Sequence, residues 1–381
     1  MSATTVEEIR KDETSEDKKS ELLLDSLEIK GYRCFEHLTI EKLGRVNLIV
    51  GKNNVGKTAL LEALWIYANH DETKILHEIV FGRNEITDEK NLSHESLREY
   101  NFAIRNLFAN RPATPTKNQI ENESSYLVIS EAGRDLDYLK HKFFNHNEEE
   151  ESFNNKFDKA HLKTIGSKTT YIKYFYDFKF EKPVAAYLPR IDRIIKNLFI
   201  NSAGLKNEKL IEFWDVIALT PLEDKVVEAL HLLLPSLKRI DFIGYPNGSS
   251  NRVPVVRIKN EKERLPLKSF GEGMTRLLGI SLALVQCQDG MLFIDEIESG
   301  LHYSVLPDVW KLIFKTAKDL NVQVFATTHS KDCVEVFAAA AEESPEDGML
   351  IRLERQGEKI IAKTINEERL ELAVNHDVEV R

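Results

Sequence analysis

The chain has 381 residues, 42% of them hydrophobic, a length that allows two or three domains with a substantial core. Its 52 Lys and Arg against 62 Asp and Glu give a net charge of −10, which argues against a protein that coats DNA through its average charge but leaves room for a local basic face. The cysteines, Cys34, Cys287 and Cys333, are odd in number and widely spaced, which excludes a disulfide framework and a zinc-ligand spacing and favours a reducing compartment.

Residues 1–20 are polar and charged without periodicity, and we expect a disordered tail there with no signal peptide. The longest apolar run, "LLGISLALVQCQDGMLFI", is broken by Gln286, Gln288 and Asp289. It therefore predicts a buried helix, a turn and a strand in place of a membrane span. Both observations favour a cytoplasmic protein with no membrane partner.

Residues 21–70 alternate like two or three strands with a turn at Gly44, and the apolar strand Val46 to Val50 leads into a glycine-rich loop and a helix. Residues 71–190 hold short helical pieces, an acidic run and loop-like stretches. Within residues 191–381, an ordered series of helices and apolar strands returns, most clearly from Leu265. This layout predicts an α/β domain made from both ends of the chain, with an inserted α+β region at 71–190.

The loop "GKNNVGKT" matches the pattern G-x-x-x-x-G-K-[ST]. Its glycines let backbone N–H groups surround a β-phosphate at the start of the next helix, where Lys57 reaches the β- and γ-phosphates and the Thr58 hydroxyl can ligate Mg²⁺. Because an apolar strand precedes it and a helix follows it, we interpret it as a phosphate-binding loop and not as a flexible turn. The predicted ATP contacts are Gly51, Asn53, Asn54, Val55, Gly56, Lys57, Thr58 and Ala59.

The apolar segment Met291 to Ile294 predicts a buried strand that ends in two carboxylates, Asp295 and Glu296. P-loop proteins place a second Mg²⁺-linked ligand at the end of such a strand, and Asp295 has that position. Glu296 can act as the general base that polarises the attacking water. An exposed acidic turn is the alternative, which the matched phosphate loop disfavours.

A further apolar strand, "VQVFATT", ends at His329. Single histidines more often cap helices or lie in cores, but ligands gather beyond the carboxyl ends of parallel strands. We therefore expect His329 to donate a hydrogen bond to the γ-phosphate or to the water, and to act with Lys57 and Glu296 in catalysis.

The stretch "SFGEGMTR" predicts a glycine-bearing turn that opens a helix, suited either to a phosphate or to an ordinary helix cap. With "GKNNVGKT", "FIDE" and "TTHS", in chain order, it resembles the ATP-binding-cassette (ABC) head of SMC, RecF and related ATPases. That head is a mixed sheet flanked by helices. The resemblance implies that Ser269, Gly271 and Gly273 form the signature motif, which contacts the γ-phosphate bound by the other copy of a head-to-head dimer.

The segments "LEIKGYRCFEHLTIEKLGRVNLIV", "DEIESGLHYSVLPDVW" and "ELAVNHDVEVR" are similar to the OLD (overcoming lysogenization defect) family of ATPases and their stand-alone relatives. The likeness runs from about Leu24 to Arg381 and is weakest at about 70 to 185. It implies Arg33 near the nucleotide phosphates and a loop from Glu298 to His302 that crosses the dimer interface. Full OLD nucleases carry a Toprim domain after the ATPase, and the 52 residues after His329 are too few for one.

Three other patterns fall in the inserted region. Glu131, Asp135 and Asp137 echo a Toprim metal triad but stand too close together, so we expect no nuclease activity. The alternating stretch Tyr171 to Phe180 could stack nucleic-acid bases, although a half-buried strand is the commoner meaning. Gln119, the sole glutamine between the phosphate loop and position 130, lacks the surroundings of the Q-loop glutamine that ABC heads use, so that position stays unassigned.

Together these patterns predict an ATPase that binds ATP and Mg²⁺ and works as an ATP-gated switch in a homodimer or higher homo-oligomer. The OLD resemblance implies a separately encoded effector, a nuclease or toxin, in anti-phage defence. The alternative is a RecF/SMC-like DNA-repair or chromosome-maintenance ATPase that clamps DNA, against which the acidic charge and the lack of coiled-coil heptads weigh. A nucleotide-dependent scaffold that does not hydrolyse ATP is a third possibility.

Overall fold

The computed structural model describes residues 22–69, 73–85, 103, 106–107, 125–130, 138–146, 159–165, 170–174, 195–244 and 252–366. For residues 73, 74 and 77 and for the described residues of 125–130, 138–146, 159–165 and 170–174, it describes the backbone alone. The residues 131, 135 and 137, Gln119 and the end of the aromatic stretch, 175–180, lie outside this part of the chain.

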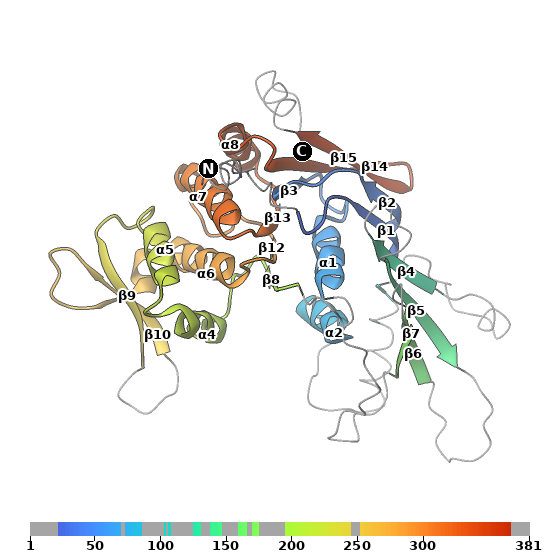
Figure 1. Cartoon of the computed structure of the whole chain (residues 1–381), viewed down its shortest axis with the longest axis horizontal. Coiled ribbons are helices and arrows are strands. Elements are labelled where there is room, and N and C mark those ends of the chain that lie inside the picture. Colours follow the sequence, from blue (N-terminus) through green and yellow to red (C-terminus); the bar gives the residue numbers. More distant parts are fainter. Residues whose placement is uncertain are drawn as a thin grey trace, which may run out of the picture.

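A six-stranded sheet forms the centre of the molecule (Figure 1). Its outermost strand β15 is antiparallel to β14, and the other neighbours are all parallel. Every residue of strands β3 (Val46–Val50), β12 (Met291–Ile294) and β13 (Gln323–Thr327) is buried, as expected for parallel strands covered on both faces. In spatial order the strands are β15 (Lys359–Asn366), β14 (Gly348–Gln356), β3 (Val46–Val50), β13 (Gln323–Thr327), β12 (Met291–Ile294) and β8 (Asn197–Ile200).

Alternate side chains of the central sheet enter two separate hydrophobic cores. On one face, Leu48 and Leu292 share a core with residues of helices α4 (Asn207–Ile217), α5 (Pro221–Leu230), α6 (Glu272–Gln286), α7 (Leu306–Asp319) and α8 (Lys331–Glu342). On the other face, Ile49 and Phe293 pack with α1 (Lys57–Ala68) and α2 (Thr73–Gly82). Helices α1 and α6 therefore lie on opposite faces of the sheet.

A second, fully antiparallel sheet begins with the N-terminal strands and continues into the predicted insertion. Strand β4 pairs with β1, so that Ile129 lies opposite Ile29. The inserted segment thus extends a sheet of the N-terminal lobe, and the domain boundary near residue 70 remains a prediction. In spatial order the strands are β2 (Phe35–Ile40), β1 (Leu27–Tyr32), β4 (Ser125–Ser130), β5 (Tyr138–His146), β6 (Lys159–Ile165) and β7 (Thr170–Tyr174).

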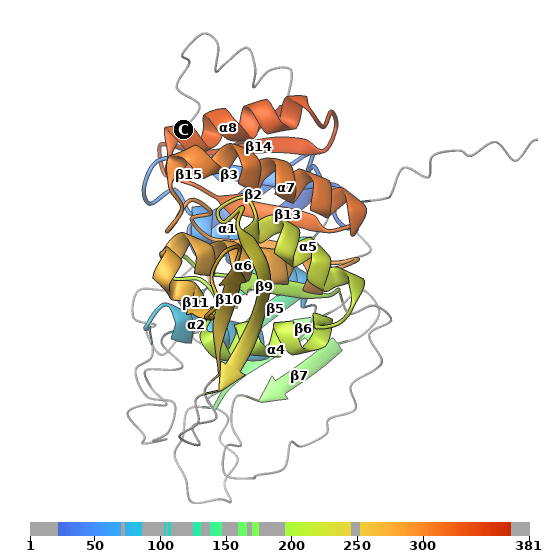
Figure 2. The same ribbon diagram turned by 90° about the vertical axis from the view of Figure 1, so that its left-hand side faces the viewer.

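A third sheet lies outside the helices α4–α6, nearest the viewer in Figure 2. It contains β9 (Leu237–Gly244), β10 (Arg252–Ile258) and β11 (Leu265–Pro266), and its buried side chains Ile240, Phe242 and Val256 join the core of α4–α6. Short 3-10 turns η1 (Leu267–Phe270) and η2 (Tyr303–Val305) precede α6 and α7.

The observed architecture is the predicted α/β class, a mixed central sheet flanked by helices. The predicted helix, turn and strand in "LLGISLALVQCQDGMLFI" are confirmed as α6 and β12. In the described ranges, none of the helices combines the length and the apolar character that crossing a membrane requires.

Candidate functional site

The phosphate loop connects β3 to α1 at the carboxyl edge of the central sheet. Gly51 and Gly56 have φ angles of 146° and 93°, a region that L side chains rarely adopt. A Cβ on Gly51 would lie 2.5 Å from the carbonyl oxygen of Leu353, and one on Gly56 would lie 2.5 Å from Cys34 Sγ. The glycines are therefore required both by backbone conformation and by the close approach of β14 and the β1–β2 turn.

The rest of the loop presents backbone atoms. The side chains of Val55 and Ala59 are buried. These residues would therefore contact a phosphate through their backbone N–H groups. Asn53 and Asn54 are exposed, and Asn54 has a φ of 62° while its carbonyl oxygen accepts a hydrogen bond from Arg355 Nη2 at 3.2 Å. No side chain caps the first turn of α1, so its N–H groups remain open to an anion.

Lys57 points into this loop and is 6% exposed. Its ammonium donates hydrogen bonds to the carbonyl oxygens of Gly51 at 2.7 Å and Lys52 at 3.1 Å. Burial lowers the pKa of Lys57, while Asp295 and Glu296 oppose that shift. A buried ammonium held only by neutral carbonyls is well suited to exchange them for phosphate oxygens.

We expect Gly56→Ala to weaken ATP binding by at least about 100-fold, because the methyl group would displace the β1–β2 turn or the loop itself. Titration with a fluorescent ATP analogue measures the effect. Gly357→Ala is the matched control: it also has a positive φ, 62°, but its Cβ would meet nothing within 4 Å, and binding should stay close to that of the wild type. Equal affinities of the two variants would contradict the assignment.

Asp295 follows β12 and lies beside the start of α1. The Thr58 hydroxyl donates to its carboxylate at 3.2 and 3.3 Å, and the Thr327 hydroxyl donates to Oδ1 at 2.6 Å. A hydroxyl and a carboxylate are the hard oxygen ligands that Mg²⁺ prefers, so this pair fits the predicted metal. Among the described residues no group of three or more His, Cys, Asp or Glu could hold a metal, so Thr58 and Asp295 would need ligands of other kinds beside them, such as phosphate and water.

Glu296 occupies a strained position directly after Asp295. Its φ is 48°, a left-handed conformation uncommon for residues other than glycine. Its N–H donates to Thr327 Oγ1 at 2.8 Å, and its carbonyl oxygen accepts from Arg276 Nη2 at 3.0 Å. The peptide that carries the predicted base is thus held from both sides.

Arg276, which the sequence analysis did not select, organises this region. Its guanidinium donates to the carbonyl oxygens of Asn201 at 2.7 Å and of Asp295 and Glu296 at 3.0 Å each. The side chain is 6% exposed, and burial lowers its pKa against the opposing effect of Asp295, Glu298 and Glu296. In the sequence, Arg276 is an arginine in an apolar helix, and nothing indicates that its side chain binds three backbone carbonyl groups. These carbonyl groups come together only in the folded chain.

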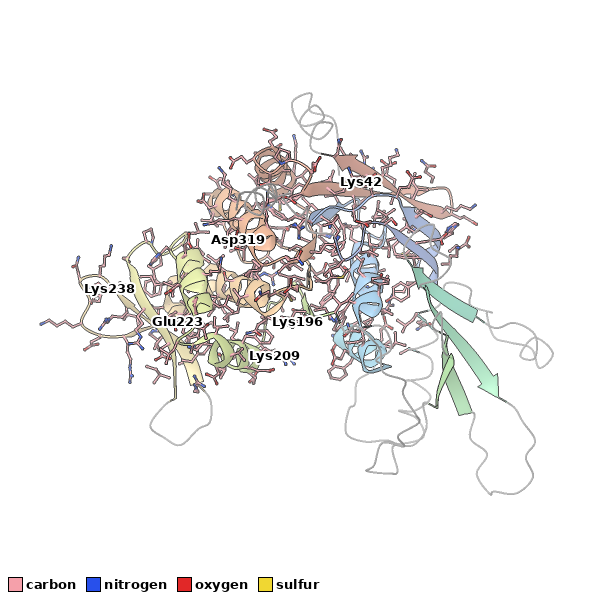
Figure 3. All side chains as sticks on the ribbon, viewed as in Figure 1. Lys42, Lys196, Lys209, Glu223, Lys238 and Asp319 are labelled. Atoms are coloured by element: carbon pink, nitrogen blue, oxygen red, sulfur yellow. The ribbon has the colours of Figure 1, made fainter. Side chains whose placement is uncertain are left out.

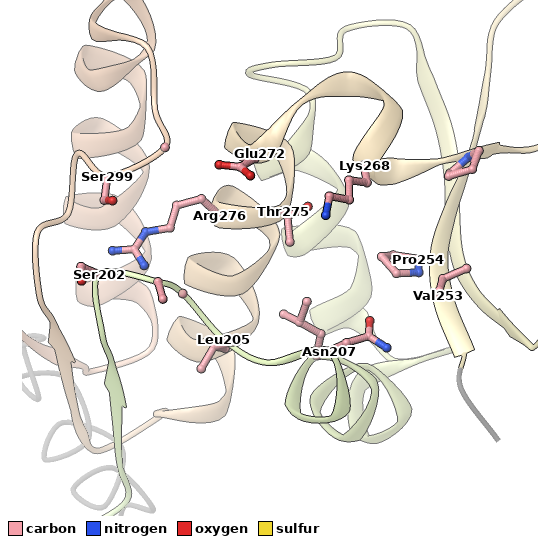
Figure 4. A pocket seen from close by; sticks show the side chains of 15 residues that line it. Ser202, Leu205, Asn207, Val253, Pro254, Lys268, Glu272, Thr275, Arg276 and Ser299 are labelled. Atoms are coloured by element: carbon pink, nitrogen blue, oxygen red, sulfur yellow. The ribbon is translucent and has the colours of Figure 1, made fainter. Parts of the chain in front are cut away.

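A cavity of about 730 Å³ lies between the start of α6, the connection from β8 to α4, and β10 (Figure 4). The guanidinium of Arg276 points to the wall that carries Ser202 and Ser299, whereas Lys268 lies on the other side. The signature segment and the loop after Glu296 are therefore walls of one cavity, joined through Arg276.

Asn201 is a second residue that sequence reasoning missed. It follows β8, the parallel neighbour of β12, and the N–H of Asp295 donates to the carbonyl oxygen of Ile200 at 2.8 Å. The exposed Asn201 amide is therefore at the same sheet edge as Asp295 and offers another hard oxygen. A strand of four residues is too short to give a clear pattern in sequence, so nothing there marked Asn201.

His329 lies at the end of β13, as predicted, and its side chain is exposed. The backbone N–H of His329 donates to Glu298 Oε1 at 2.9 Å, while Glu298 Oε2 is buried and has no hydrogen-bond partner within the described residues. The loop after Glu296 is thus tied to the loop that carries His329.

The signature residues are on the opposite face of the sheet from α1. Ser269 and Gly271 are exposed, and Gly271 has a φ of 97° with nothing within 4 Å of its Cβ position. A Cβ on Gly273 would lie 3.0 Å from the carbonyl oxygen of Gly300, so this glycine permits α6 to approach the loop after Glu296. The segment faces open space and not the phosphate loop of its own chain.

Arg33 makes contacts other than those that the resemblance implies. Its Nε lies 3.0 Å from Glu62 Oε2 and its Nη1 lies 2.9 Å from Glu85 Oε1, and the side chain is 11% exposed. Burial disfavours the charged form of Arg33, but Tyr32, Glu62 and Glu85 together outweigh it and raise the pKa of Arg33. A role of Arg33 toward phosphate stays a prediction, and it requires exchange of a carboxylate for a phosphate oxygen.

Residues 23–334 match the family described as the AAA ATPase domain. An ATP/GTP phosphatase of Helicobacter pylori is 25% identical over 375 residues, which are 92% of this chain and 97% of that protein. Uncharacterized protein MJECL11 of Methanocaldococcus jannaschii is 36% identical over 93 residues, 24% of this chain and 82% of that protein. The solved structure of an SMC head bound to the C-winged helix domain of ScpA aligns with 91% of this chain and over 98% of its own length, with 13% identity and a TM-score of 0.48. Because the family match spans most of the chain, including the phosphate loop and the acidic strand end, this protein belongs to the AAA ATPase domain family.

Proposed function

We propose that this AAA ATPase family member is an ABC-type, OLD-like enzyme that hydrolyses ATP in a head-to-head homodimer and acts as a switch. The observation that carries the proposal is the separation of its two phosphate-binding elements. Helices α1 and α6 lie on opposite faces of the central sheet, and the exposed Ser269 and Gly271 face open space. One chain therefore offers two half-sites, which a second copy can complete.

Within one copy, the loop N–H groups and Lys57 bind the β- and γ-phosphates. Thr58 and Asp295 would hold Mg²⁺, which neutralises phosphate charge when it is bound. Glu296 takes a proton from the attacking water, and its constrained backbone fixes the direction of the carboxylate. His329 donates a hydrogen bond at the γ-phosphate, and Ser269, Gly271 and Gly273 of the other copy close the site.

The biological role rests on resemblance. The OLD likeness supports a cytoplasmic switch that controls a separately encoded nuclease or toxin in anti-phage defence. A higher homo-oligomer built from such dimers is compatible with the same half-sites. A RecF/SMC-like DNA-maintenance ATPase would use the same nucleotide chemistry and differs only in what the dimer holds.

Mixing two inactive variants tests the shared site. Lys57→Ala removes the phosphate ligand but keeps an intact signature, and Ser269→Arg blocks the signature but keeps an intact loop. Each alone should be inactive, whereas an equimolar mixture should recover up to about a quarter of wild-type turnover, because half of the dimers are mixed and each has one complete site. Phosphate release measures the turnover.

Lys57→Ala mixed with Glu296→Gln is the control, because both lesions fall on the loop side and no complete site can form. Recovery in this control, or no recovery in the first mixture, would overturn the dimeric site. Wild-type turnover by Ser269→Arg alone would do the same.

A further inference from the structure

The third sheet carries a surplus of positive charge in a chain that is acidic as a whole. Residues 236–268 contain eight Lys or Arg against three Asp or Glu, whereas the entire chain has a net charge of −10. Six of these cations form what we call the basic face. They are all exposed, and they lie on β9, at the end of β10 and in the turn that leads to β11: Lys238, Arg239, Arg257, Lys259, Lys262 and Arg264.

The strand register places like charges next to one another. Arg239 on β9 lies directly opposite Arg257 on β10. Leu265 on β11 lies opposite Val256, so Arg264, one residue earlier, comes beside Arg257. Like charges directly opposite on neighbouring strands destabilise a sheet. The row of three arginines therefore costs stability and has no structural benefit of its own.

Carboxylates in the described part of the chain do not form ion pairs with this row. None of the six cations forms an ion pair there, although Asp241 is on β9 and Glu261 and Glu263 are in the adjoining turn. The neighbouring Arg252 shows the contrast, because both of its terminal nitrogens bind the Asp215 carboxylate at 2.7 Å. The basic face is left available for an anionic partner.

The chemistry of the face favours phosphates over a protein surface. Protein interfaces are anchored by apolar and aromatic side chains, and single-stranded nucleic acids by aromatic side chains. Among the described residues, the large hydrophobic side chains that are exposed are Val216, Leu219 and Tyr303, and none belongs to the third sheet. Arginine forks and lysine ammonium groups without such anchors match the backbone of a duplex.

We propose that the basic face binds the phosphate backbone of a double-stranded nucleic acid, without reading its sequence. Lys238 lies at the outer edge of this lobe, and the third sheet forms the layer in front of the helices (Figures 2 and 3). The face is thus separate from the nucleotide site at the edge of the central sheet. The inference goes beyond the proposed ATPase activity and can fail or hold independently of it.

Fluorescence anisotropy with a labelled duplex of about 30 base pairs, as DNA and as RNA, tests the proposal across about 50 to 200 mM salt. The wild type should bind at least one duplex more tightly than single strands, with affinity that falls steeply as salt rises. Arg239→Gln/Arg257→Gln should weaken binding about 10-fold and reduce the salt slope by about 2, one unit for each lost phosphate contact. DNA and RNA arms distinguish the two sources of the backbone.

Lys311→Gln/Lys315→Gln is the matched control, because it removes two exposed cations that pair with Glu343 at the end of α8 and with Glu228 on α5. It should bind the duplex as the wild type does. Both double variants should keep basal ATP turnover, and the arginine variant should not melt earlier. The proposal is overturned if the wild type binds neither duplex or if the two double variants bind the duplex equally well. It is also overturned if polyglutamate displaces the duplex at an equal concentration of negative charge, because that result would assign the basic face to an acidic protein.

Discussion

Glu296→Gln should lower ATP turnover by about 10²- to 10⁴-fold, the contribution typical of a positioned general base, while ATP binding stays close to that of the wild type. Glutamine has nearly the shape of glutamate but cannot accept the proton of the attacking water. The backbone contacts to Thr327 and Arg276 do not involve the substituted side chain, so the local fold is retained. An ATP-bound dimer should accumulate, which size-exclusion chromatography with light scattering detects.

Glu343→Gln provides the control, because it removes an exposed carboxylate that pairs with Lys311 far from the sheet edge. It should leave turnover and dimerisation unchanged. Unchanged turnover in Glu296→Gln would remove Glu296 as the base. A loss of ATP affinity as large as the loss of turnover would assign it a binding role instead.

The strands and loops that carry the main motifs could be predicted because parallel strands buried on both faces have continuous apolar sequences. Val46 to Val50 and Met291 to Ile294 have that pattern, and the polar residues that follow them therefore mark one edge of the sheet. Their assembly at this edge is observed: Thr58 contacts Asp295, although 237 positions separate them. Local pattern was sufficient here because the chemistry begins where each strand ends.

The remaining features depend on contacts between distant segments. Asn201 reaches the site through the pairing of β8 with β12, and a four-residue strand gives little signal in sequence. Arg276 binds backbone carbonyls, whose positions no residue type reveals. Arg33 illustrates the opposite case: the motif implied phosphate, and the fold supplies Glu62 and Glu85 as nearer anions.

Arg276→Met should lower turnover by at least about 100-fold and change the KM for ATP little. The substitution keeps most of the side-chain volume but removes the donors to the carbonyl oxygens of Asn201, Asp295 and Glu296. The N–H groups of Gly204 and Ser299 still donate to the Asn201 and Glu296 oxygens, so the main loss is the link between these two segments and the Asp295 carbonyl. The strained backbone of Glu296 then keeps its hydrogen bonds with Thr327 and Ser299 but loses the one from Arg276. A misplaced base loses rate and not affinity. Turnover as a function of ATP concentration separates kcat from KM.

Arg276→Lys keeps the charge but cannot span three carbonyls, because a lysine lacks the planar fork of a guanidinium. We expect it to lie between the wild type and Arg276→Met in kcat at similar thermal stability, which distinguishes positioning of the base from a general loss of fold. Wild-type kcat in Arg276→Met, or a rise of KM that accounts for the whole defect, would contradict the assignment.

The position of Arg276 on α6 gives its contacts a further consequence. In the proposed dimer, the residues at the start of this helix form the half-site for the other copy, and one turn later the same helix binds the Glu296 carbonyl of its own chain. Nucleotide bound by the partner would therefore fix α6 and, through Arg276, the base of the neighbouring site. Turnover by the wild type should therefore rise cooperatively with ATP concentration. Arg276→Met should reduce the Hill coefficient to about 1, because without the arginine helix α6 no longer links the nucleotide of one site to the base of the other.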